Sequence, residues 1–217
     1  MNKYPWLAAL WTRTGNDHGK FFCGGTLVAN RFVISAAHCM WDYKGKLPNG
    51  DIPGNIVSYK LKEEDLSVLL GEHNNKKKGE TILTEKIVNV EKITIHPNFP
   101  FEEFEIGKKP DINAMIYDIV LLKLTEDIVL TKYTPACLPK KSEGVRFDNE
   151  LVTAAGWGSI EPDGPPFVYP DEPKEVNLTI IEAKACGTSL LQPMRICSGN
   201  IDSINTGWKA TCEVSEY

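Results

Sequence analysis

The histidine at position 38 stands in a sequence context that suits a general base. Small residues precede it in the run Ser35–Ala37, and cysteines stand on either side of it at Cys23 and Cys39. A bridge between the two cysteines would close a loop of roughly 15 residues, worth ~3 kcal/mol in the chain-entropy model. It would also fix the backbone that aims the imidazole, and a general base must lie within hydrogen-bond reach of its nucleophile. A lone histidine is more often a hydrogen-bonded core residue, and His38 by itself favours that simpler interpretation.

Motifs along nearly the whole chain resemble those of chymotrypsin-like serine proteases, the trypsin or peptidase S1 family. The segment CGGTLVANRFVISAAHC, residues 23–39, resembles the region around the catalytic histidine of that family. Other motifs follow the family order, with each one weak alone and the ordered set specific: Tyr4-Pro5-Trp6, residues 117–124 (YDIVLLKL), Cys137-Leu138-Pro139, Gly156-Trp157-Gly158 and residues 194–199 (MRICSG). The resemblance implies an all-β fold, a chymotrypsin-like double six-stranded β-barrel with the active site between the barrels.

The resemblance also implies roles for two residues of this chain. His38 would be the general base, and Asp118 would orient its ring and stabilise the imidazolium. Local sequence agrees, because a carboxylate directly before the apolar run Ile119–Leu122 should be partly buried, and a buried charge needs a partner. A ring N–H of His38 would supply that partner. Tyr117 stands where the family often has asparagine, which is a minor departure.

The family's nucleophilic serine is absent from the expected position. In the family it lies four residues after a cysteine, in a glycine-rich turn whose backbone N–H groups form the oxyanion hole. After Cys212 that position holds Glu216, while Ser215 comes one residue too early and has no flanking glycine. We therefore expect the chain as written to be inactive as a serine endopeptidase.

The same comparison indicates a domain that is truncated at both ends. Residues 1–217 would be a trypsin-like serine protease domain, with a first barrel over about 1–120 and an incomplete second barrel over about 121–217. The activating N-terminus would precede Tyr4, and the last barrel strands would follow the end of the sequence.

Cysteine spacing leaves several pairings open. The chain has six cysteines and no C-x-x-C pair, which argues against a structural zinc site. The resemblance, in contrast, implies two disulfides that the family shares, Cys23–Cys39 and Cys186–Cys197. Disulfides indicate an oxidising compartment, so we expect a secreted, extracellular protein although the chain has no signal peptide.

The resemblance leaves Cys137 and Cys212 without partners in this chain. The family partner of Cys212 lies downstream, and that of Cys137 lies in an upstream pro-segment. Cys137 therefore predicts a modular zymogen with a tethered pro-domain, similar to clotting-cascade proteases or to the clip-domain proteases of haemolymph. The sequon Asn177-Leu178-Thr179 is a weak pointer to glycosylation and to the same compartment.

The expected substrate is a protein or peptide with an apolar side chain at the cleavage site. In the family, the base of the primary pocket lies two residues before the cysteine that precedes the active-site turn. Counted from Cys212, that position is Ala210. A trypsin-like pocket would carry aspartate to pair with Arg or Lys. The long turn-rich segment 41–61, directly after His38, would either restrict the cleft or be a plain surface insertion.

Composition excludes several classes of function. A chain of 217 residues with 42% hydrophobic and 24% charged residues fits one globular domain. The net charge of −5 argues against a nucleic-acid-binding surface, and no run reaches the ~18 apolar residues of a membrane span. The sequence indicates no cofactor and no metal.

Strands, rather than helices, must position these residues. Short apolar runs rich in β-branched residues recur without helical periodicity, which predicts strands over 21–28, 31–37, 66–70, 81–96, 119–124, 151–155 and 175–182.

Two alternatives to the truncated protease stay open. One is a natural non-catalytic homologue that binds a protease or its substrate as a regulatory module. The other is a dead-end splice product, because the family-like KATCE changes abruptly to VSEY.

Overall fold

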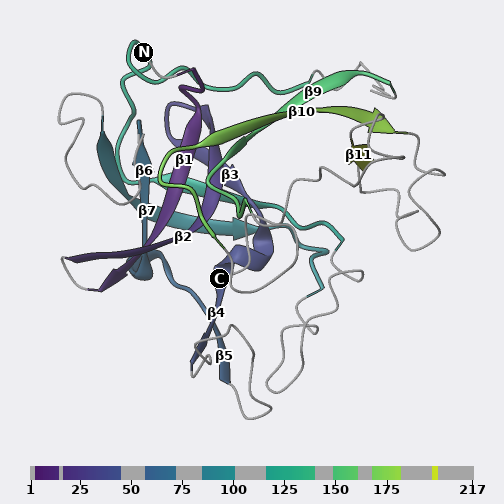
Figure 1. The fold of residues 1–217 in the computed structure, drawn as a ribbon. Helices are drawn as coiled ribbons and strands as arrows, with labels where there is room; N and C mark the ends of the chain where they lie inside the picture. The colour runs from purple at the N-terminus through teal and green to yellow at the C-terminus, as the bar shows by residue number, and fades with distance from the viewer. Residues whose placement is uncertain are drawn as a thin grey trace.

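The computed structural model describes residues 3–14, 17–44, 57–71, 85–100, 116–139, 149–160, 168–181 and 197–199. Within these ranges the chain forms β-strands and two short 3-10 helices (Figure 1). In chain order the elements are β1 (Leu7–Thr14), β2 (Asp17–Ala29), β3 (Phe32–Ser35), η1 (Ala37–Met40), β4 (Trp41–Lys44), β5 (Val57–Lys60), η2 (Glu63–Asp65), β6 (Leu66–Leu70), β7 (Lys86–Ile95), β8 (Val120–Leu124), β9 (Leu151–Gly156), β10 (Lys174–Ile181) and β11 (Cys197–Gly199).

Six strands close into an antiparallel barrel in the order β1-β2-β3-β8-β7-β6. Burial alternates along β3 and β8, because successive side chains of a strand point to opposite faces. Val33 of β3 and Leu122 of β8, which are paired in register, are therefore both fully buried in the barrel core. Strand β6 is buried on both faces. Val68 belongs to the barrel core, and Leu69 belongs to a second apolar cluster outside it.

A second, open sheet has the strand order β11-β10-β9. It joins the barrel through Trp157, which follows β9 and is 1% exposed. This indole packs with Ala9, Trp11 and Leu69 of the barrel, and it meets the ring of Phe21 edge to face at 5.8 Å. The expected all-β fold is confirmed: one closed six-stranded barrel with an open three-stranded sheet is consistent with the chymotrypsin fold.

The structure adds strands that sequence patterns did not predict. Strand β1 contains Leu7–Leu10, a run with two alanines and no β-branched residue, so its strand state comes from burial between β2 and β6. Strands β4 and β5 pair at the two ends of the segment predicted as the long loop 41–61, and they project from the barrel in Figure 1. The glycines and prolines between them concealed the alternation in their short sequences.

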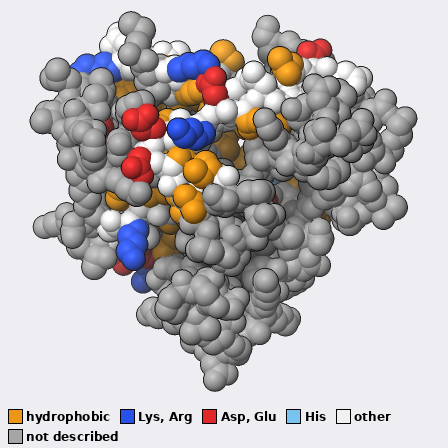
Figure 2. Space-filling model, viewed as in Figure 1, with side chains coloured by type: hydrophobic (Ala, Val, Ile, Leu, Met, Phe, Trp, Pro, Cys, Tyr) orange, Lys and Arg blue, Asp and Glu red, His pale blue; other side chains and the backbone are white. Residues whose placement is uncertain are grey.

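Charged side chains pair on the barrel surface. Glu91 contacts both Arg31, at 2.9 Å, and Lys123, at 2.6 Å, while Lys86 contacts Glu126 at 2.8 Å. On the face shown in Figure 2, acidic and basic side chains lie intermixed among the described residues. In the part of the chain that the structure describes, no helix has the length and apolar character that a bilayer crossing requires.

Candidate active site

The pairing of two barrel strands brings His38 and Asp118 to the same place. Strand β3 pairs antiparallel with β8, and Ser35 at its end lies opposite Val120 at the start of β8. His38 follows β3 in the short helix η1, whereas Asp118 precedes β8. Both residues therefore leave the barrel at the same end of this strand pair, although they are 80 residues apart in the sequence.

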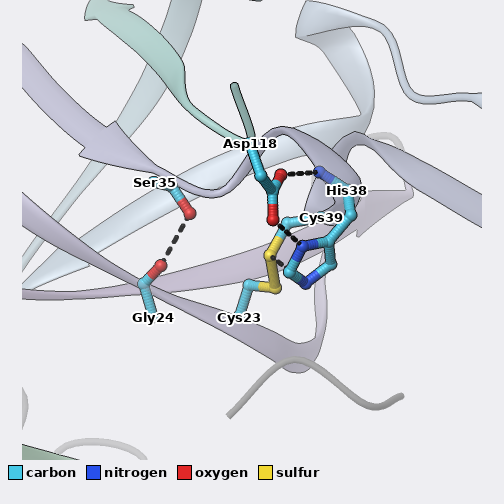
Figure 3. The surroundings of a disulfide bond; sticks show 6 residues. All are labelled: Cys23, Gly24, Ser35, His38, Cys39 and Asp118. Carbon is cyan, nitrogen blue, oxygen red and sulfur yellow. Dashed lines mark hydrogen bonds and ion pairs between the residues drawn. A yellow bond between two sulfur atoms is a disulfide. The ribbon is translucent and has the colours of Figure 1, made fainter. Parts of the chain in front are cut away.

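Asp118 holds His38 through both of its carboxylate oxygens (Figure 3). Oδ1 accepts a hydrogen bond from the backbone N–H of His38 at 2.8 Å, and Oδ2 lies 2.5 Å from Nδ1 of the ring. An ionised carboxylate only accepts hydrogen bonds, so Nδ1 must carry the proton. In the neutral ring, the lone pair is then on Nε2, the atom that a general base uses.

The surroundings of Asp118 keep its carboxyl group ionised. Burial raises the pKa of this group, because it disfavours the charged form. Hydrogen bonds from the ring and backbone of His38 and from the backbone of Ala37, together with the attraction of the His38 ring, lower the pKa. The balance leaves the pKa of Asp118 below its ordinary value of 3.8, so the carboxylate is charged at neutral pH.

The disulfide between Cys23 and Cys39 braces the histidine. It joins β2 to η1 with a Cα–Cα distance of 6.3 Å, and both residues are buried. Nε2 of His38 lies 3.7 Å from Sγ of Cys39, and a disulfide sulfur is at most a weak hydrogen-bond acceptor. Cys23, His38 and Cys39 are also the described residues whose potential metal-ligand atoms cluster, but both sulfurs are bonded to each other and are not thiolates.

The serine nearest to His38 in the sequence has a structural role. Ser35 donates its hydroxyl to the carbonyl oxygen of Gly24 at 2.7 Å and is buried. In Figure 3 this hydrogen bond lies apart from the imidazole. This hydrogen bond thus links β3 to β2.

The remaining residues predicted from sequence fall at other places. Cys137 is an exposed free thiol. Asn177 is exposed on β10, where its Oδ1 accepts a hydrogen bond from the Thr153 hydroxyl at 2.9 Å. Cys197 begins β11. Outside the described residues lie Cys186, Ala210, Cys212, Ser215 and Glu216.

The sequence predicts no role for a pair of rings beside Asp118. The rings of His96 and Tyr117 stack with their centroids 4.7 Å apart and an angle of 9° between their planes. Tyr117 has a φ of 57°, in the left-handed region. The only signal in the sequence was that Tyr117 stands in place of asparagine, a residue that tolerates positive φ.

Comparison with known proteins defines the class of this protein. The family model described as Trypsin matches residues 1–213. The chain therefore belongs to the trypsin family of serine proteases. Members of this family act on proteins and are typically secreted, in keeping with the disulfide of this chain.

Several curated relatives are similar over most of this chain. Identity is 32% over 192 residues with Ovochymase-2 of Mus musculus, covering 87% of this chain and 25% of that protein. It is 33% over 168 residues with Granzyme C of Mus musculus, covering 77% and 52%. With Phenoloxidase-activating factor 3 of Holotrichia diomphalia it is 24% over 208 residues, covering 93% and 53%. The chain thus spans between a quarter and about half of the length of these relatives.

Proposed function

We propose that this chain carries the base and its orienting carboxylate for a secreted serine endopeptidase domain. His38 is the general base, and Asp118 is the residue that orients it. The observation that carries this proposal is the contact of both Asp118 oxygens with His38, one on the ring and one on the backbone. That arrangement suits the His–Asp half of a catalytic triad.

The chemistry follows from the hydrogen bonds. Because Asp118 accepts from Nδ1, Nε2 of His38 is the atom that removes the proton of a serine hydroxyl as the oxygen attacks a peptide carbonyl. The imidazolium formed in this step is stabilised by the ionised carboxylate, and it later returns its proton to the leaving amine. Since the ring is braced by the Cys23–Cys39 disulfide, little reorientation is required in either step.

The catalytic status of these 217 residues by themselves is a separate part of the proposal. They contain no Gly-Asp-Ser-Gly-Gly run, the family's motif around the nucleophile, so the nucleophile and oxyanion turn of the family are absent from them. We expect the isolated 217-residue chain to hydrolyse no peptide bond through this mechanism.

The experiment begins with the transcript. Its 3′ end is sequenced across the codons for Thr211–Glu213, and the longest chain that it encodes is expressed, activated and treated with a fluorophosphonate probe. We expect labelling of a serine beyond Glu213 that is lost in the matched His38→Ala variant. An encoded glycine-flanked serine that stays unlabelled would overturn the endopeptidase assignment.

The absence of this motif also favours a second candidate, a non-catalytic homologue that binds and regulates a protease or its substrate. This alternative predicts a transcript that ends after Tyr217 and a stable secreted species of about the 24.2 kDa calculated for this chain. Failure to detect that species in the medium of the source tissue would exclude it.

Finer features of the domain are proposed from the resemblance to the trypsin family. Residues 1–217 comprise a first barrel, about 1–120, and part of a second, about 121–217. The closed barrel that ends with β8 and the separate sheet that begins with β9 support this division. Cys186 and Cys197 form a second disulfide, and Asn177 carries an N-linked glycan. The side chain of Asn177 is exposed, and its amide nitrogen is not used in the hydrogen bond with Thr153, which supports the glycan.

Substrate and partner are also proposals. Alanine at position 210 gives the primary pocket an uncharged base, so the cleaved peptide would present an apolar side chain. An upstream pro-domain is joined through Cys137, whose exposed free thiol supports this role. The similarity to Phenoloxidase-activating factor 3 of Holotrichia diomphalia, of which this chain covers 53%, supports a protease domain within a longer, modular protein.

A further inference from the structure

The residue directly before Asp118 has a strained backbone. Among the described residues other than glycine, only Tyr117, at 57°, and Asn149, at 69°, have positive φ values. Asparagine adopts this region readily, but a bulky L-residue such as tyrosine is disfavoured there. A conformation of this kind persists only where the surrounding structure fixes it, and such sites cluster at functional positions.

His96 fixes this backbone from two sides. Its ring stacks on the ring of Tyr117 at 4.7 Å, and its backbone N–H donates to the carbonyl oxygen of Ile119 at 3.1 Å. The N–H of Ile119 in turn donates to the carbonyl oxygen of Tyr117 at 2.7 Å, which closes a three-residue turn centred on Asp118. Asp118 therefore lies between two residues that are both held by His96.

The ring of His96 is itself held in one orientation. Its Nδ1 accepts a hydrogen bond from the backbone N–H of Asn98 at 3.2 Å, so the proton of the neutral ring is on Nε2. Both stacked rings are only partly buried, so the contact is not a part of the barrel core. Its effect should be local, on the turn that carries Asp118.

We propose that His96 and Tyr117 form a positioning pair that sets the carboxylate of Asp118 against His38. The stacking stabilises the left-handed conformation of Tyr117, and that conformation directs Asp118 toward both N–H groups of His38. Neither ring of the pair acts on substrate, since each works through Asp118. This inference rests on the proposed function, because it concerns the same His–Asp pair.

The test uses the hydrogen bond of the pair as its readout. The full 217-residue chain is labelled with ¹⁵N in its four histidines, and the ring N–H resonances are recorded. The proton between Nδ1 of His38 and Asp118 should give the resonance shifted furthest downfield, identified by its loss in His38→Ala. We expect Tyr117→Phe to keep it, because the stack remains, and Tyr117→Ala and His96→Ala to lose or broaden it.

A double variant separates backbone conformation from general damage. Asparagine tolerates positive φ without a stacking partner. His96→Ala/Tyr117→Asn should therefore recover the resonance that His96→Ala loses. Near-ultraviolet circular dichroism verifies that each variant is folded. If an alanine variant does not fold, leucine at the same position replaces it, because leucine keeps the bulk and removes the aromatic face.

The outcomes distinguish this inference from the function on which it rests. No downfield resonance in the unmodified chain would contradict the His38–Asp118 pairing itself. A resonance that persists in both alanine variants, or that the double variant does not recover, would overturn the positioning pair and leave the His–Asp assignment standing.

Discussion

Asp118 contacts His38 twice, once at the ring and once at the main chain. The contact with Nδ1 selects the ring tautomer, and the hydrogen bond from the backbone N–H fixes where η1 begins relative to β8. The same carboxylate thus sets which ring nitrogen of His38 carries the proton and where the backbone of His38 lies. Its removal should affect both the site and the stability of the barrel end.

We predict that Asp118→Asn lowers the free energy of unfolding at pH 7 by about 1.5–3 kcal/mol, the range for hydrogen bonds to charged groups. The pKa of Asp118 is lowered in the folded protein, so its carboxylate contributes stability above the ordinary value of 3.8. That contribution is lost as the pH falls through the folded-state pKa. Urea unfolding at pH 7 and at acidic pH should therefore show the difference between the two proteins narrowing in acid.

The control for this prediction is Asp127→Asn. Asp127 contacts Arg31 at 3.4 Å, but its side chain is 66% exposed, so its ion pair is screened by solvent. Its removal should change stability little at either pH. An equal loss in both variants, or a loss in Asp118→Asn that is independent of pH, would contradict the role assigned to the partly buried carboxylate of Asp118.

A second prediction concerns Gly25 in the CGGTL motif. A Cβ at this position would lie 2.9 Å from Cγ1 of Val33 and 3.2 Å from the carbonyl oxygen of Ile34. The second atom is backbone of the paired strand and cannot move without disturbing the sheet. We expect Gly25→Ala to destabilise the barrel by roughly 1–3 kcal/mol, the usual cost of overpacking.

The matched substitution is Gly156→Ala at the end of β9. No atom of the described residues lies within 4 Å of a Cβ built at this glycine, so the change should be within about 0.5 kcal/mol of neutral. Urea unfolding of the two variants side by side measures the difference. Equal stabilities would show that Gly25 is not confined as the structure indicates.

Sequence was informative where short-range pattern and long-range pairing agree. The apolar runs predicted as strands at 66–70 and 119–124 form β6, which is buried throughout, and β8, in which burial alternates. The motif around His38 identified the Cys23–Cys39 disulfide that the structure forms. It was less informative where tertiary contacts decide the local structure. The alanines of β1 have little intrinsic preference for a strand and adopt it because β2 and β6 flank them.

The stacking of His96 on Tyr117 shows the same limit at the site. No local pattern reports a positive φ at tyrosine, because the conformation depends on a ring that is 21 positions away in the sequence, at 96 against 117. Sequence marked only the replacement of asparagine. The contact that makes the replacement tolerable became visible with the packing of β7 against β8.

A third prediction concerns the cysteines. Cys137 is exposed and free, whereas Cys23 and Cys39 are buried and bonded to each other. Iodoacetamide applied to the folded, unreduced chain should therefore modify Cys137, and peptide mapping by mass spectrometry should find Cys23 and Cys39 modified only after denaturation and reduction. Protection of Cys137 in the folded chain would contradict its exposure and remove the support for a disulfide-linked pro-domain.

The last prediction concerns the contact that attaches the β9–β11 sheet to the barrel. Lys3 pairs with Glu175 of β10 at 2.6 Å, but both side chains are largely exposed, and exposed ion pairs add little because solvent screens them. Trp157 is fully buried against Phe21 and the barrel cluster. Since deleting a large buried ring leaves a cavity, Trp157→Ala should cost about 3–5 kcal/mol, whereas Glu175→Gln should leave the unfolding midpoint unchanged.

Trp157→Phe tests whether ring packing is the source of that energy. Phenylalanine keeps the edge-to-face contact with Phe21, and it removes an indole N–H that has no hydrogen-bond partner among the described residues. The loss of the donor offsets part of the lost volume, because a buried donor without a partner is itself destabilising. Urea unfolding should place Trp157→Phe much nearer to the unmodified chain than to Trp157→Ala. If Glu175→Gln instead proved as damaging as Trp157→Ala, the sheet would be held by its surface charges and not by the buried indole.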